Sequence, residues 1–178
     1  MAEDVILTDG VIRLEKFTDA HLPGLAALLQ DPEVVANTRV PDPVPDGFEH
    51  VWLQAYRDGD ADGTRDGFVI EDAETGAFLG LAGLVAIERD ANQGEIGYVV
   101  SSEARGRGIA SRALRLVTDY ALGEVGLDRV QLLISVDNTP SLRVAERCGY
   151  QREGVLRNAY FKPGRRIDTV VFSRLKSD

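Results

Sequence analysis

The chain has 178 residues, of which 44% are hydrophobic and 28% are charged, and its formal net charge is −9. These values are typical of a soluble globular protein of one ordinary domain. No apolar run approaches the roughly 20 residues that span a bilayer, and one cysteine, Cys148, cannot form an internal disulfide.

The N-terminal residues are acidic and lack the basic segment of a secretory signal. Together with the single cysteine, this favours a cytoplasmic protein without a membrane partner. The two histidines, His21 and His50, stand far apart in the sequence and show no metal-ligand spacing. No metal is therefore expected, although a magnesium site made only of carboxylates stays open.

Charge is distributed unevenly along the chain. Residues 1–100 carry 20 Asp and Glu against 6 Lys and Arg, a net charge of −14, whereas residues 101–178 carry 9 against 14, a net charge of +5. Such asymmetry indicates either two ligands of opposite charge or a solvated surface of uneven composition.

The first half of the chain begins with a short alternating run at 11–17, which predicts a strand. A helical pattern follows over 18–33, with Thr18 as its N-cap. The prolines of 40–47 predict a loop. A second helix is expected over 48–59, ending at a glycine. No repeat or low-complexity tract interrupts this order.

Residues 67–100 predict three strands joined by turns at "ETG" and "DANQG". A helix is expected over 109–122, because one set of apolar residues recurs with helical spacing: Ile109, Ala113, Leu116, Val117 and Tyr120. The largely apolar run 129–136 predicts a strand buried on both faces.

A short helix is expected to follow Asn138, which is a cap candidate, and to end at Gly149. Two closing strands, 150–161 and 166–175, are joined by a hairpin turn at "KPG". This order predicts an α/β fold with helices packed on a mixed sheet. No segment has the composition of a linker, so residues 1–178 are expected to form one domain.

The stretch "EARGRGIAS", residues 103–111, is called the glycine turn here and lies between a predicted strand and a predicted helix. The first N–H groups of a helix lack internal partners, and the helix dipole adds partial positive charge there. Glycines let an anion approach the backbone, and Arg105 and Arg107 supply further donors. The glycine turn therefore indicates a phosphate site.

Other interpretations of the glycine turn fit less well. A Walker loop needs Lys followed by Ser or Thr after its second glycine, where this chain has Ile109 and Ala110. The dinucleotide fingerprint needs a third glycine, where Ser111 stands. An RNA contact is disfavoured because the chain is acidic, so no nucleic acid is expected. A plain turn with solvated arginines stays open.

Longer segments carry a resemblance. The pattern Arg105-x-x-Gly108-x-Ala110 resembles the pyrophosphate signature Q/R-x-x-G-x-G/A of the GNAT acyltransferases, and residues 95–111 resemble the segment from their fourth strand to their third helix. Residues 138–157 and 164–175 resemble the RimJ/RimL branch, which acetylates ribosomal proteins. The resemblance covers about residues 10 to 175.

The resemblance implies a GNAT fold with about seven strands and about four helices, in which the fourth and fifth strands splay apart. It implies an acetyl-CoA-dependent N-acetyltransferase in which Tyr98, Val99 and Val100 pair with pantetheine, and an N–H near Val99 binds the thioester oxygen. The amides of six residues would hold the pyrophosphate, with a hydroxyl from Ser111: Arg105, Gly106, Arg107, Gly108, Ile109 and Ala110.

Asn138 and Ser141 are three residues apart, so they share a helix face. Their residue types alone favour helix capping. The resemblance implies instead that Asn138 contacts pantetheine and that Ser141 protonates the leaving thiolate. Many other GNAT enzymes carry a tyrosine acid where this chain has Ala145. A methyl group cannot donate a proton, which leaves Ser141 as the acid and Tyr98 as a weaker substitute.

Glu95 is the candidate base, acting through water, unless it is an ordinary exposed charge at a strand end. A protein α-amine, with a pKa of about 8, needs less help than a lysine at about 10.4. The branch suggests a protein N-terminus as acceptor, contacted by the two N-terminal helices and loop 37–50. Aminoglycosides, polyamines and a non-catalytic acyl-CoA-binding module stay open as alternatives, as do a monomer and a homodimer.

Overall fold

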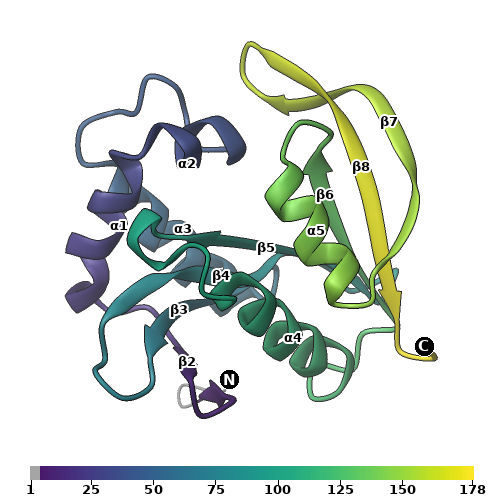
Figure 1. The fold of residues 1–178 in the computed structure, drawn as a ribbon, viewed down its shortest axis with the longest axis horizontal. Coiled ribbons are helices and arrows are strands. Elements are labelled where there is room, and N and C mark those ends of the chain that lie inside the picture. The colour runs from purple at the N-terminus through teal and green to yellow at the C-terminus, as the bar shows by residue number, and fades with distance from the viewer. Residues whose placement is uncertain (1–4) are drawn as a thin grey trace.

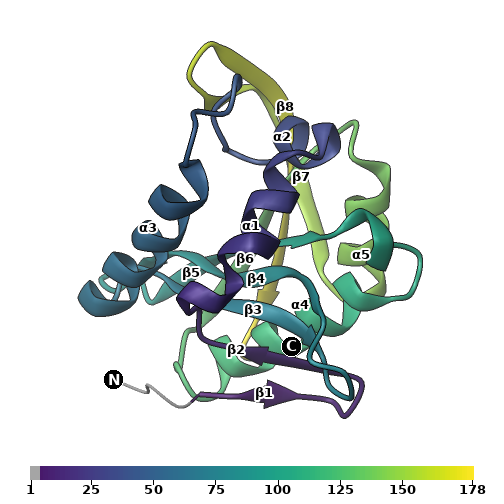
Figure 2. The same cartoon turned by 90° about the vertical axis from the view of Figure 1, so that its left-hand side faces the viewer.

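The computed structural model describes residues 5–178 and shows an open sheet with helices on both faces (Figures 1 and 2). Eight strands lie in the order β1-β2-β3-β4-β5-β6-β8-β7. The pair β5–β6 is parallel and the other neighbours are antiparallel. The predicted mixed α/β sheet is therefore confirmed. Residues 1–4 of the predicted domain 1–178 lie outside the described residues.

The strands and helices follow the predicted chain order, with one additional strand and one additional helix. The strands are β1 (Leu7–Thr8), β2 (Ile12–Glu15), β3 (Asp66–Asp72), β4 (Phe78–Glu88), β5 (Gln93–Val100), β6 (Arg129–Ser135), β7 (Gln151–Lys162) and β8 (Arg165–Leu175). The α-helices are α1 (Leu22–Leu29), α2 (Pro32–Asn37), α3 (Phe48–Asp62), α4 (Ile109–Leu122) and α5 (Thr139–Arg147). No helix among residues 5–178 is long and apolar enough to cross a bilayer.

The first predicted helix is divided in the structure. A 3-10 turn, Asp19–His21, leads into α1, and α2 begins separately at Pro32. Asp31 has an extended backbone and caps α2 by accepting from the Glu33 amide. A residue before proline disfavours the helical region, so the chain restarts there. The helix α2 and the short strand β1 raise the predicted counts of four helices and seven strands to five and eight.

The second predicted helix continues beyond Gly59 as α3 to Asp62, and Gly63 closes it with a φ of 77°. Gly59 is instead a point of close packing, because a Cβ there would lie 2.6 Å from the Arg65 side chain. The amides of Thr64 and Arg65 both donate to the Gly59 carbonyl as the chain turns back. The glycine therefore permits a tight return into β3.

Two apolar clusters lie on opposite faces of the sheet. The larger joins the sheet to α4 and α5 and includes Leu84, Ile96 and Val117. The smaller joins β4 to α1 and α3 through Leu25, Leu53, Leu81 and others. Strand β6 was predicted to be buried on both faces, and this is wrong: alternate residues only, beginning with Val130, are buried, because one face alone packs in the larger cluster.

Strands β5 and β6 pair only at their beginnings. Their register covers Gln93 with Arg129, Gly94 with Val130, and Glu95 with Gln131. Beyond Glu95 the strands separate, while β5 continues to pair with β4 as far as Val100. These two strands are the fourth and fifth of the sequence-based count, so the predicted splay is confirmed.

Candidate active site

The splay leaves one edge of β5 without a neighbouring strand over residues 96–100. Backbone N–H and C=O groups on this edge need partners, and an extended ligand can supply them as an added strand would. The predicted pantetheine-binding residues Tyr98, Val99 and Val100 all lie on this edge. The structure therefore brings these three residues to the opening between the strands.

Successive side chains of β5 point to opposite faces of the sheet. Tyr98 and Val100 pack in the larger cluster, beside α4 and α5. Val99 packs in the smaller cluster, beside α1 and α3. By the same alternation Glu95 shares the face of Val99. The opening beyond Glu95 is where both faces can reach one ligand.

The glycine turn keeps its backbone open. Gly106 and Gly108 have φ angles of 74° and 75°, and a Cβ at either position would meet nothing within 4 Å. Gly108 is the N-cap of α4, whose first backbone hydrogen bond runs from Arg112 N–H to the Gly108 carbonyl at 3.1 Å. Ile109 and Ser111 are buried, and Ala110 is half-buried. The Arg105 amide already donates to the Ser102 carbonyl at 3.4 Å, so it is not free as predicted. The amides of residues 106–111 precede the first hydrogen bond of α4, an arrangement that suits an anion.

The arginine side chains of the turn are held by carboxylates from the acidic half of the chain. Arg105 Nη2 lies 2.7 Å from Asp31 and its Nη1 lies 2.9 Å from Glu33, so it joins the turn to α2. Arg107 lies 3.8 Å from Asp72. Arg105 is thus ion-paired, whereas Arg107 is 52% exposed and remains largely solvated, and the backbone of the turn is the part that stays open to an anion.

Tyr98 and Ser141 form a hydrogen-bonded pair across the splay. The Tyr98 hydroxyl lies 2.8 Å from Ser141 Oγ. Asn138 caps α5 by accepting from the Ser141 amide at 3.3 Å, which confirms the capping interpretation and leaves the Asn138 NH₂ as a donor. Burial raises the pKa of Tyr98 to about 12, so its hydroxyl is protonated at neutral pH. The two acid candidates of the sequence are therefore one unit.

Glu95 is not an exposed strand-end charge. Its side chain is 16% exposed, and Oε1 lies 3.3 Å from Arg39 Nη2. Burial raises the pKa of Glu95, while the Arg39 charge opposes this shift. Sequence reasoning missed Arg39. Its isolation as the one Lys or Arg between Lys16 and Arg57 is visible in the sequence but does not point to Glu95.

The sequence did not predict two further features, a cluster of possible metal ligands and a hollow along α3. Glu15, His21 and Glu71 place possible ligand atoms within 4.8 Å of one another. However, Arg13 donates to Glu71 at 2.8 Å and lies 3.5 Å from Glu15, so a guanidinium already balances these carboxylates. The cluster is therefore explained by ion pairing.

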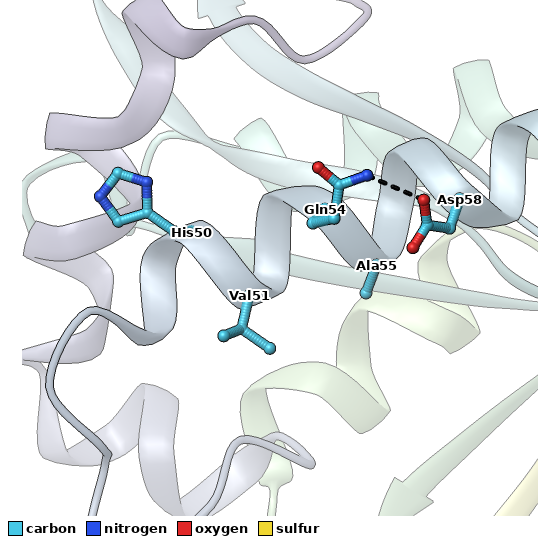
Figure 3. A pocket seen from close by; sticks show the side chains of 5 residues that line it. All are labelled: His50, Val51, Gln54, Ala55 and Asp58. Atoms are coloured by element: carbon cyan, nitrogen blue, oxygen red, sulfur yellow. Dashed lines mark hydrogen bonds between the residues drawn. The ribbon is translucent and has the colours of Figure 1, made fainter.

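A shallow hollow of about 440 Å³ lies along α3 (Figure 3). Its lining side chains are His50, Val51, Gln54, Ala55 and Asp58, most of them exposed. Gln54 donates to Asp58 at 2.8 Å across one turn of the helix. The hollow shares no residue with the splay or with the glycine turn, although it lies on the second of the two helices from which acceptor contacts were expected.

The splay of β5 and β6, with the glycine turn at the start of α4, is the arrangement that the resemblance to the GNAT acyltransferases implies. The model of the acetyltransferase (GNAT) domain matches residues 12–151, so the chain belongs to the GNAT acetyltransferase family. The uncharacterized N-acetyltransferase p20 of Bacillus licheniformis is 30% identical over 167 residues, covering 94% of this chain and 93% of p20.

Two solved structures share the fold. RimL, a ribosomal L7/L12 alpha-N-protein acetyltransferase in complex with coenzyme A, is 21% identical, with a TM-score of 0.86 over 98% of this chain and 100% of RimL. Spermidine N-acetyltransferase from Vibrio cholerae, in complex with CoA and spermine, is 24% identical, with a TM-score of 0.81 over 95% and 98%. The predicted acetyl-CoA-dependent N-acetyltransferase is confirmed as a class.

Proposed function

We propose that the chain transfers acetyl groups from acetyl-CoA to the α-amine of a protein N-terminus by direct attack. The observation that carries the proposal is the arrangement around β5. Glu95 lies on the face of α1 and α3, and the Tyr98–Ser141 pair lies on the face of α5. The amine can lose its proton on one face while the thiolate gains one on the other.

The cosubstrate would bind along the opening. The pyrophosphate would accept from the amides of the glycine turn, and the two αL glycines let it approach the backbone. Pantetheine would pair with Tyr98, Val99 and Val100 and accept from the Asn138 NH₂. This orientation brings the thioester to the splay, with the acceptor side of the carbonyl toward Glu95.

In the reaction the neutral amine attacks the thioester carbonyl. The N–H near Val99 would donate to the developing oxyanion. A new C–N bond forms, the C–S bond breaks, and the amine proton passes to Glu95 through water. The thiolate takes a proton from Ser141, which regains it from Tyr98, and solvent restores both sites. The high pKa of Tyr98 keeps this donor protonated through the working pH range.

A protein α-amine suits this machinery because its pKa of about 8 leaves a useful neutral fraction at pH 7. A single carboxylate with a raised pKa is sufficient to take its proton. RimL, which shares the fold, is described as an alpha-N-protein acetyltransferase. A ribosomal-protein acceptor would place the reaction in the cytoplasm, as the sequence predicts.

A polyamine is the second candidate, favoured by the net charge of −14 on residues 1–100 and by the fold shared with spermidine N-acetyltransferase. The structure weakens the charge argument, because Asp9, Asp31 and Glu33 pair with arginines of the other half. Two arginines, Arg105 and Arg112, therefore offset part of this negative charge within the molecule.

The test is amine-dependent release of CoA from acetyl-CoA. The acceptors are Ala- and Ser-initiated peptides, the same peptides with a blocked N-terminus and one free lysine, spermidine, and an aminoglycoside. We expect the unblocked peptides to have the highest kcat/KM. Preference for spermidine or for the lysine peptide would overturn the N-terminal assignment. Release with none of the acceptors would favour a non-catalytic acyl-CoA-binding module.

A further inference from the structure

Arg39 lies beside the candidate base on the acceptor side of the sheet. It stands in the loop between α2 and α3, and its side chain is 54% exposed although Glu95, at 3.3 Å, is only 16% exposed. The guanidinium therefore covers the carboxylate from the solvent side. Arg39 presents a planar set of N–H donors, and one carboxylate contact leaves several of them for a ligand.

The segment that carries Arg39 is fixed by the C-terminal hairpin. Lys162, at the end of β7, is 4% exposed and donates to the carbonyls of Val35 at 2.7 Å and Val40 at 2.8 Å. These carbonyls flank Arg39 in the chain. Arg165 donates to the carbonyl of Ala36 at 2.7 Å. Figure 2 shows the turn between β7 and β8 beside α2.

We propose that Arg39 selects acceptors that carry a carbonyl next to the reacting amine, and that Lys162 positions it for this role. The proposal rests on the proposed function and names the part of the acceptor that is recognised. The amine must lie near Glu95 to lose its proton. Arg39 lies against the same carboxylate, so it also reaches what is attached to the amine.

The geometry of an α-amino group fits this site. Standard bond lengths place the first carbonyl oxygen of a peptide about 3 Å from the α-nitrogen. An amine one water molecule away from Glu95 can turn this oxygen toward the Arg39 guanidinium, which extends from the same carboxylate toward solvent. Spermidine has methylene groups there and no acceptor, and its next ammonium group would meet the positive charge of Arg39. Arg39 thus favours one acceptor and disfavours the other.

The simpler role for Arg39 is to balance the charge of Glu95. In that role its removal would raise the pKa of Glu95 further, because the arginine charge opposes the effect of burial. Every acceptor would be affected equally by this change. The ratio of kcat/KM for a peptide to kcat/KM for spermidine therefore separates recognition from charge balance.

The experiment compares the parent with Arg39→Ala, using an Ala-initiated peptide and spermidine as acceptors. We expect the ratio of kcat/KM for the peptide to kcat/KM for spermidine to fall about 10- to 100-fold, the range for losing a charged donor. Equal loss with both acceptors would overturn the proposal. A parent that prefers spermidine would instead contradict the proposed function.

The matched control is Arg57→Ala. Arg57 is a 42% exposed arginine on α3, and its ion pair is with Asp19 and not with Glu95. We expect this variant to leave the acceptor ratio unchanged. The acetyl-CoA dissociation constant of each variant should equal that of the parent. An unchanged constant would show that the acetyl-CoA site is intact. A change of the ratio in Arg57→Ala as large as that in Arg39→Ala would overturn the proposal.

The positioning role is tested with Lys162→Met and Lys162→Arg. Methionine fills the space but leaves the carbonyls of Val35 and Val40 without their donor, so the peptide-to-spermidine ratio should fall. Arginine keeps two donors and should restore most of the ratio. An unchanged ratio in a folded Lys162→Met variant would remove Lys162 from the proposal. If Lys162→Met does not fold, the test is whether the peptide-to-spermidine ratio of Lys162→Arg stays close to that of the parent.

Discussion

The two faces of β5 carry opposite kinds of chemistry within four residues. On the α5 face, Tyr98 and Ser141 are neutral hydroxyl groups that share one hydrogen bond. On the α1 and α3 face, Glu95 and Arg39 are a charged pair. Strand alternation thus places the proton donor and the proton acceptor of the proposed mechanism on opposite faces of one strand.

Burial acts on both faces but with different results. It raises the pKa of Tyr98 to about 12, which keeps the hydroxyl in the form that donates. It also raises the pKa of Glu95, which makes the carboxylate a stronger base once ionised, and Arg39 limits this rise. One physical cause thus prepares an acid and a base, because the two groups begin from very different pKa values.

The largest effect is expected when acetyl-CoA cannot bind, because neither the Tyr98–Ser141 pair nor Glu95 then has a thioester to act on. Gly108→Glu places a like charge and a side chain in the glycine turn, so acetyl-CoA should no longer raise the melting temperature. The control is Gly47→Glu. Gly47 is also a helix N-cap, with a φ of 72° and open space around its Cβ position. This control should lose similar stability and keep acetyl-CoA binding. Retained binding in Gly108→Glu would show that the glycine turn is not the anion site.

The next largest effect on the reaction is expected on the α5 face, where Tyr98 and Ser141 donate the proton in the proposed mechanism. Ser141→Ala should lower kcat by about 10²-fold or more, within the range for general acid catalysis, with little change in acetyl-CoA affinity. Tyr98→Phe should cost less, because Ser141 lies nearer the sulfur in the proposed mechanism. The double variant should be no worse than Ser141→Ala alone, since the pair acts as a unit. Additive losses would mean that the two hydroxyl groups act separately.

Glu95, on the α1 and α3 face, should control the pH dependence of kcat. The carboxylate accepts the proton, so kcat at saturating acceptor should rise with pH through the raised pKa of Glu95. Glu95→Gln should lower kcat about 10-fold at pH 7 and remove this rise. Arg39→Ala should move the rise to higher pH. Ionisation of Tyr98 should cause no fall below about pH 10, because its pKa is about 12. A pH profile unchanged in Glu95→Gln would assign the base elsewhere.

The smallest effect is expected from long-range charge. Raising the salt from about 0.05 M to 0.5 M should increase KM about two- to threefold for an Ala-initiated peptide followed by lysines, since exposed charges are screened. The effect should stay small, because several carboxylates of the acidic half are paired with arginines. A peptide without lysines is the control. A tenfold change in KM would show that the acidic half steers the acceptor strongly.

Local signals account for the parts that sequence predicted well. The helical repeat of α4 and the glycines at its start depend on residues that are neighbours in the chain. The two-residue strand β1 has too few residues for a periodic pattern. The break between α1 and α2 comes from Asp31, which caps α2, and from Pro32, the first residue of α2. The stretch around them otherwise continues the helical pattern, so the sequence predicted one helix.

The site was predicted residue by residue but not as an arrangement. Tyr98 and Ser141 were both acid candidates, yet their contact joins residues 43 apart in the chain and needs the whole sheet. The exposure of Glu95 depends on where the loop after α2 lies. Arg39 was not predicted because a lone arginine in a loop belongs to no local pattern. Only its contact with Glu95 in the folded structure indicates a role.

The hydrogen bonds of Lys162 join residues 127 and 122 positions apart in the chain. During synthesis the segment of Arg39 leaves the ribosome early, but its anchor is made only when nearly all of the chain has emerged. Contacts of such separation form late in folding. A chain stopped before residue 162 would also lack β8, whose Val170 and Phe172 are fully buried in the cluster that packs α4. The last residues of the chain therefore complete the anchor of the Arg39 segment and the core beneath the glycine turn in the same step.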